Sequence, residues 1–81
     1  MDDDTAAALR DLVALADALP GQFRPEFDLG YWSGVTGAES WYVRFEGDVE
    51  GTEFTVLGFT AAEALRKAGE EALRRRAAVE R

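Results

Sequence analysis

Residues 41–73 read WYVRFEGDVEGTEFTVLGFTAAEALRKAGEEAL. Apolar and polar side chains alternate before and after the central Gly-bounded acidic turn, which is the pattern of strands that bury one face. The residues that follow, Thr60-Ala61-Ala62-Glu63, have the spacing of a capping box, in which the first hydroxyl and the last carboxylate satisfy backbone N–H groups of the first helical turn. The stretch therefore predicts strands over about 40–48 and 52–59 and a helix over about 61–79.

The turn between these strands sets their register. A two-residue turn at Glu50-Gly51 would place Phe45 opposite Val56 and Val43 opposite Gly58. This pairing gathers the large apolar side chains on one face. Since Glu-Gly is not the strongest hairpin dipeptide, a longer loop over 47–51 is the alternative.

A first helix is predicted over about 5–19, with Asp4 or Thr5 as its N-cap. Pro20-Gly21 would end it. Its apolar stripe consists of Leu9, Leu12, Val13, Ala16 and Leu19.

A third strand is predicted over about 26–32, after Pro25. Here Phe27, Leu29 and Tyr31 alternate with Asp28, Gly30 and Trp32.

These elements predict one α+β domain over residues 1–81, in the order α-β-β-β-α. The simplest arrangement is a three-stranded antiparallel sheet with both helices packed on one face. The predicted core is Leu9, Leu12, Val13, Ala16, Phe27, Leu29, Trp41, Val43, Phe45, Phe54, Val56, Ala64, Leu65 and Ala68.

The residue types that the chain lacks limit the functions it can have. The chain contains no His and no Cys, which removes the commonest general base, the thiolate nucleophile and the usual zinc ligands. We therefore expect no catalytic residues, no metal site and no cofactor. No apolar run approaches the ~20 residues of a membrane span, and the acidic start Met1-Asp2-Asp3-Asp4 is unlike a signal peptide. A cytoplasmic protein without membrane contact is the expectation.

Charge bears on the choice of partner. The net charge is −7, and the acidic residues dominate residues 1–60, whereas residues 61–81 are slightly basic. Because an acidic body repels phosphate backbones, nucleic-acid binding is disfavoured. The acidic surface has two interpretations: it keeps the protein soluble, or it meets a basic protein partner.

If the helices cover one face of the sheet, alternation leaves the other face open. That face would show Trp32, Tyr42, Arg44 and Leu57, with Phe59 near the edge. The acidic residues Asp48, Glu50 and Glu53 lie in or beside the central turn. Together these residues are the predicted partner-binding set. Scattered exposed aromatics are also common on proteins without partners. A homodimer through this face or through an edge strand is a further alternative.

Two resemblances to known families exist. The segment around Gly58-Phe59-Thr60, with the helix that follows, resembles HicB-like antitoxin domains over residues 54–73, where a G-x-T-x-E-E-A-L segment opens a helix packed on a small sheet. That resemblance implies an inhibitor that covers the active surface of a basic toxin. The element order is also similar to a double-stranded-RNA-binding domain. That family has basic residues where this chain has Thr60-Ala61-Ala62-Glu63, so this resemblance implies the fold and not RNA binding.

The functional hypothesis is a non-catalytic acidic protein-binding domain, of the inhibitor or antitoxin type or an accessory factor of a phage or other mobile element. One alternative is a nucleic-acid-binding domain of double-stranded-RNA-binding topology. The other is a small structural homo-oligomer.

Overall fold

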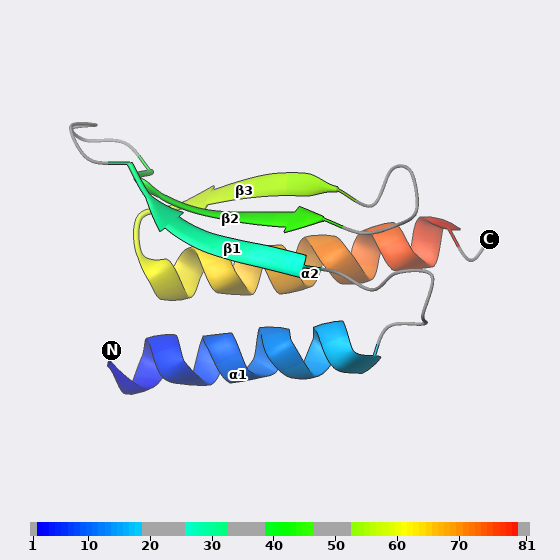
Figure 1. Ribbon diagram of the computed structural model, residues 1–81, viewed down its shortest axis with the longest axis horizontal. Helices are drawn as coiled ribbons and strands as arrows, with labels where there is room; N and C mark the ends of the chain where they lie inside the picture. The colour runs from blue at the N-terminus through cyan, green and yellow to red at the C-terminus, as the bar shows by residue number, and fades with distance from the viewer. Residues whose placement is uncertain (1, 19–25, 33–38, 47–52, 80–81) are drawn as a thin grey trace.

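The elements follow one another as α-β-β-β-α. The computed structural model describes residues 2–18, 26–32, 39–46 and 53–79. Helix α1 spans Asp3–Ala18, strand β1 Glu26–Tyr31, strand β2 Trp41–Glu46, strand β3 Phe54–Gly58 and helix α2 Ala61–Val79. The strands form one antiparallel sheet in the order β1-β2-β3. Both helices lie on the same side of this sheet (Figure 1), which confirms the predicted α+β architecture.

Helix α2 packs directly against the sheet through small side chains. Ala64, Ala68 and Ala72 are buried on the same helix face as Leu65, so the helix axis can approach β2 and β3 closely. The approach is tightest where α2 begins. A Cβ atom on Gly58 would lie 2.6 Å from the backbone nitrogen of Ala64, so this position requires glycine.

Helix α1 packs against α2, and its buried side chains differ from the predicted stripe. Thr5, Ala8 and Leu12 are buried, whereas Val13 is 43% exposed. The prediction for Val13 was wrong because apolar residues surround much of this Ala-rich helix. Small Ala8 then lets α1 lie against α2 with a different rotation about its axis. The N-cap also lies two residues before Asp4, the earlier of the two predicted positions, because Asp2 Oδ1 accepts a hydrogen bond from the Thr5 N–H at 2.7 Å.

The register between β2 and β3 differs from the tight-turn prediction. Phe45 lies opposite Phe54 and Val43 opposite Val56, a shift of two residues. A shift by two keeps every side chain on its predicted face, because side chains alternate with a period of two. The predicted turn itself lies outside the described residues.

Three aromatic rings continue the core across the sheet. Phe27 stacks on Phe45 at 6.2 Å between ring centroids, and Phe45 stacks on Phe54 at 5.0 Å. The guanidinium of Arg75 lies 5.1 Å from the Phe54 ring centroid, so α2 covers the end of the row with a cation–π contact.

Candidate partner-binding surface

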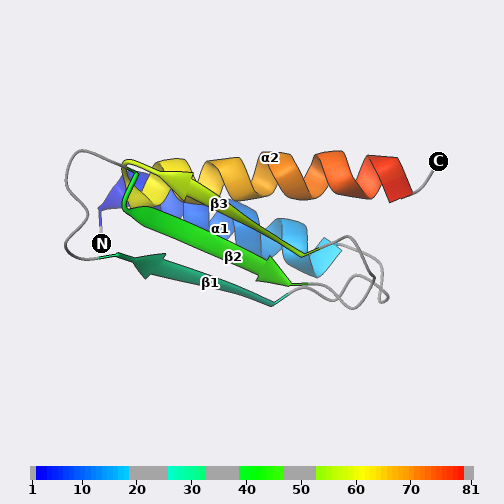
Figure 2. The same cartoon turned by 90° about the horizontal axis from the view of Figure 1, so that it is seen from above.

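The sheet face opposite the helices carries four of the predicted partner-binding residues. In the view of Figure 2 this face points toward the reader, with the helices behind or beside it. Tyr42 lies between Gly30 on β1 and Leu57 on β3, and the next row places Arg44 between Asp28 and Thr55. Trp32 follows β1 on the same face and is 48% exposed. Phe59, just beyond β3, is also exposed.

The aromatic part of this face is built around a glycine. The rings of Trp32 and Tyr42 lie 5.2 Å apart at a tilt of 36°. The Tyr42 ring lies over Gly30, where an added Cβ would be only 2.2 Å from the Tyr42 Cζ atom. Because Gly30 has no side chain, the tyrosine ring covers the backbone of β1 and meets the indole. The result is a half-exposed apolar platform of Trp32, Tyr42 and Leu57.

Beside this platform lies a group of charged side chains whose net charge is negative. Arg44 Nη2 donates to Asp28 Oδ2 at 3.0 Å, and its Nε lies 3.6 Å from Glu46 Oε1. The hydrogen bond to Asp28, then the charge of Glu46, raise the pKa of the Arg44 guanidinium above its usual range. Two carboxylates thus balance one cation, so this row of the face is acidic rather than basic.

The remaining predicted residues are the acidic ones at the central turn. Glu53 is exposed directly before β3. Asp48 and Glu50 lie outside the described residues, so their position relative to the platform stays a prediction. The structure brings Trp32, Tyr42, Arg44 and Leu57 together on one face, and Glu53 stands at the end of the same sheet.

Lys67 forms a group of polar contacts at the outer edge of β3 that the sequence did not predict. Lys67 Nζ contacts Glu39 Oε2 at 2.7 Å and Glu63 Oε1 at 3.2 Å, and it donates to the Leu57 carbonyl at 2.9 Å. The hydrogen bond to Glu39, followed by that to Glu63, raises the pKa of Lys67. Only the Glu63–Lys67 spacing is visible in the sequence, as an i, i+4 pair. The other contacts depend on the tertiary fold.

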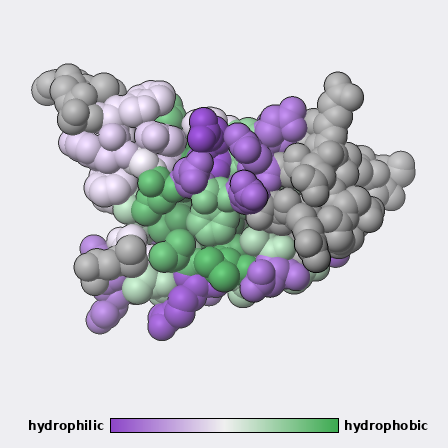
Figure 3. Space-filling model, in the orientation of Figure 1, coloured by the Kyte–Doolittle hydropathy of each residue, from purple (hydrophilic) through white to green (hydrophobic). Residues whose placement is uncertain are grey.

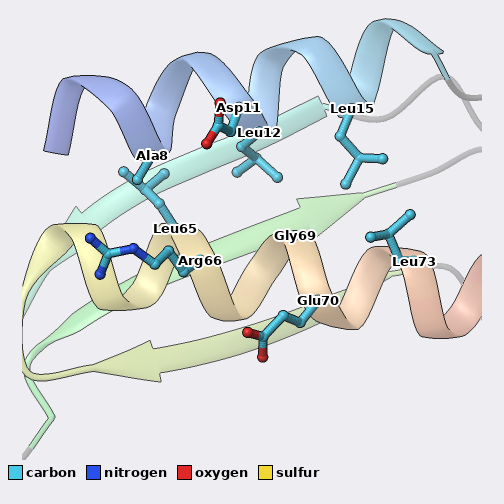
Figure 4. A pocket seen from close by; sticks show the side chains of 9 residues that line it. All are labelled: Ala8, Asp11, Leu12, Leu15, Leu65, Arg66, Gly69, Glu70 and Leu73. Carbon is cyan, nitrogen blue, oxygen red and sulfur yellow. The ribbon is translucent and has the colours of Figure 1, made fainter. Parts of the chain in front are cut away.

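A groove lies between the two helices. It has a volume of about 320 Å³. Figure 4 shows its leucine side chains extending from α1 and α2 toward the space between the helices. Leu73, at one end, is 51% exposed. The walls are apolar, and Asp11, Arg66 and Glu70 form the polar rim.

Metal-ligating clusters and membrane-spanning helices are both missing from the described ranges. Among residues 2–18, 26–32, 39–46 and 53–79, no three acidic side chains come together in a way that could hold an ion. No helix in that part of the chain has the length and apolar character to cross a membrane. Comparison with protein-family models, curated proteins and solved structures finds no match to this chain.

Proposed function

We propose that this chain is a non-catalytic protein-binding domain that contacts a basic protein through the open face of its sheet. The observation that carries the proposal is the platform of Trp32, Tyr42 and Leu57 on a face that neither helix covers. Tyr and Trp are enriched at the centres of protein interfaces because each offers a large apolar area with little conformational entropy to lose.

The charges around the platform support a basic partner. Arg44 is the basic residue of this face, and its charge is balanced by Asp28 and Glu46. The net charge of the whole chain is −7. Such a surface speeds the association of a positively charged protein and repels phosphate backbones. This is the charge arrangement expected of an inhibitor of the antitoxin type, or of an accessory factor of a mobile element, that covers the basic surface of its target.

The experiment is retention of partner proteins on immobilised, full-length protein from a lysate of the native host. Trp32→Ala truncates the platform, and Leu73→Ala is the matched control because Leu73 is about equally exposed but lies in the helix groove. We expect a basic protein to bind wild type and Leu73→Ala and to be lost from Trp32→Ala. Retention by all three variants alike would place the binding surface elsewhere.

The acidic contribution is tested separately. Reversal of charge at Asp48, Glu50 and Glu53 to lysine should weaken retention of the same protein, and raised salt should weaken it for the wild type. The nucleic-acid alternative makes the opposite prediction. If it holds, the charge-reversed variant binds duplex RNA or DNA more tightly than the wild type, and the wild type itself gives a gel shift at low salt.

A further inference from the structure

The outer edge of β1 pairs with no other strand among the described residues. The Trp32 N–H donates to the Ser40 carbonyl at 2.9 Å, so the even-numbered residues of β1 exchange hydrogen bonds with β2. Phe27, Leu29 and Tyr31 therefore direct their N–H and C=O groups to the outside of the sheet. No described strand pairs with this edge. An edge with a row of free donors and acceptors is a template for another strand.

The opposite edge of the sheet, on β3, is protected. Lys67 Nζ donates to the Leu57 carbonyl at 2.9 Å, and Arg75 Nη1 donates to the Glu53 carbonyl at 3.2 Å. Both cations come from α2, which runs beside β3 in Figure 2. Charged side chains over an edge are a common protection against pairing with another chain. The two edges of this sheet are thus built differently.

Strand β1 is also the least buried of the three strands. The buried core residues come from α1, α2, β2 and β3, and none of those described comes from β1. Phe27 and Leu29 are half-buried and Tyr31 is 56% exposed, whereas Phe45, directly opposite Phe27, is 3% exposed. Figure 3 shows a continuous apolar area between β1 and α1 on this side of the molecule.

We propose that β1 pairs antiparallel with β1 of a second copy of this chain, about a two-fold axis at Leu29. This register joins the two free edges so that Leu29 faces Leu29 and Phe27 faces Tyr31 of the other copy. On the open face, Asp28 then lies opposite Gly30 and Glu26 opposite Trp32. A register centred on Asp28 would set two carboxylates directly opposite each other, which is destabilising. The charges therefore disfavour the Asp28 register and are compatible with the Leu29 register that we propose.

We infer that a second copy of this chain pairs with the β1 edge, because the side chains of two β1 strands match one another in this register. Each apolar side chain of the core side meets an apolar partner, and no acid meets an acid. The pairing forms a six-stranded sheet and extends the apolar area beneath β1 across the two-fold axis. This proposal is independent of the basic partner, which would use the open face of the sheet instead of its edge.

Sedimentation of the intact protein from low to high micromolar concentration tests the dimer. We expect a reversible monomer–dimer equilibrium that salt strengthens, because each chain carries −7 and screening reduces their repulsion. Salt would weaken binding to a basic protein, so the two proposals can fail separately. A monomer at every concentration and salt overturns the dimer.

The edge is tested with proline, which removes a backbone donor. Tyr31→Pro removes one outward N–H from each copy, and two lost hydrogen bonds should raise the dimer dissociation constant about tenfold or more. Thr55→Pro is the matched control, since position 55 faces outward on β3 and should leave the dimer unchanged. Equal weakening by both variants contradicts the assignment to β1.

The register is tested with cysteine, which also covers the case that a proline variant does not fold. The natural chain contains no cysteine, so a single introduced thiol can pair only with its copy. Paired residues at the two-fold axis would have Cα atoms ~5.5 Å apart, within the range of a disulfide. Mild oxidation should therefore crosslink Leu29→Cys and leave Thr55→Cys monomeric. Failure of Leu29→Cys to crosslink, or equal crosslinking of both, overturns the register.

Discussion

At the scale of single residues, two glycines differ in the space around them: a side chain would clash at Gly58 and would fit at Gly69. Gly58 lies where α2 begins, and a Cβ there would be 2.6 Å from the backbone nitrogen of Ala64. Gly69 lies within α2, and a Cβ there would have Leu15 Cδ2 as its nearest neighbour at 3.9 Å, an ordinary contact. One glycine is thus required by close packing, whereas the other only weakens a helix.

We expect Gly58→Ala to destabilise the fold by about 1–3 kcal/mol, because the backbone of α2 must move away from the sheet. Gly69→Ala should stabilise it by ~1 kcal/mol, because alanine favours the helix and the groove has room for the methyl group. Urea unfolding of both variants and wild type measures the difference. Equal shifts of both variants in the same direction would contradict the packing described for α2.

Residue-scale packing also explains which parts of the open face could be predicted. Alternation in the sequence placed Tyr42, Arg44 and Leu57 on one face, and the observed register keeps them there. The contact of Tyr42 with Gly30 could not be predicted, since it depends on which residue β1 sets opposite Tyr42. A glycine within a strand is the only sign in the sequence that a ring or backbone approaches closely there.

At the scale of elements, the start of α2 is fixed by a capping box as predicted. The Glu63 N–H donates to Thr60 Oγ1 at 3.1 Å, and Glu63 Oε2 accepts from the Phe59 N–H at 3.1 Å. The carboxylate therefore reaches the residue before the cap rather than the cap itself. Thr60→Ala should cost ~1 kcal/mol of stability, measured by urea unfolding, while Thr60→Ser keeps the hydroxyl and most of the stability. A loss of the same size in both variants would show that the methyl group matters and the cap does not.

The same carboxylate makes stability depend on pH. The hydrogen bond from the Phe59 N–H, and then the contact with Lys67, lower the pKa of Glu63 below its ordinary value of 4.5. Arg75 lowers the pKa of Glu71, and the Thr5 N–H lowers that of Asp2. Folding lowers these pKa values, so the ionised carboxylates stabilise the folded state. This stabilisation is complete above the pKa of the unfolded chain and is lost as the pH falls through the pKa of the folded state.

Unfolding midpoints measured from pH 7 down to pH ~2 should therefore fall with acidification. The Glu63→Gln variant should start from a lower midpoint and lose less of it. An equal loss in the variant and the wild type would mean that the ionised Glu63 does not stabilise the fold.

The elements that could be predicted are those whose signals are local. The capping box fixes the start of α2, and strict alternation fixes the faces of β2 and β3. The rotation of α1 could not be predicted, because Ala8 and Val13 are both apolar and only contact with α2 decides which is buried. The β2–β3 register was wrong by two residues, since several connection lengths give the same pattern of faces.

At the scale of the whole molecule, three surfaces of the described fold have different characters. The open face joins an aromatic platform to paired ions, the β3 edge is covered by cations of α2, and the β1 edge is free. We propose a basic protein as the partner of the face and a second copy of the chain as the partner of the edge.

Retention of a host protein by wild type, Trp32→Ala and Leu73→Ala is the most direct test of the proposed binding face. The exposed fractions of Trp32 and Leu73 are similar, at 48% and 51%. Each truncation therefore removes a large side chain that is about half accessible to a partner. We predict that one basic protein is retained by wild type and by Leu73→Ala, is released by raised salt, and is absent from Trp32→Ala. Retention by Trp32→Ala equal to that of wild type, or retention of no protein by any of the three, would contradict the account.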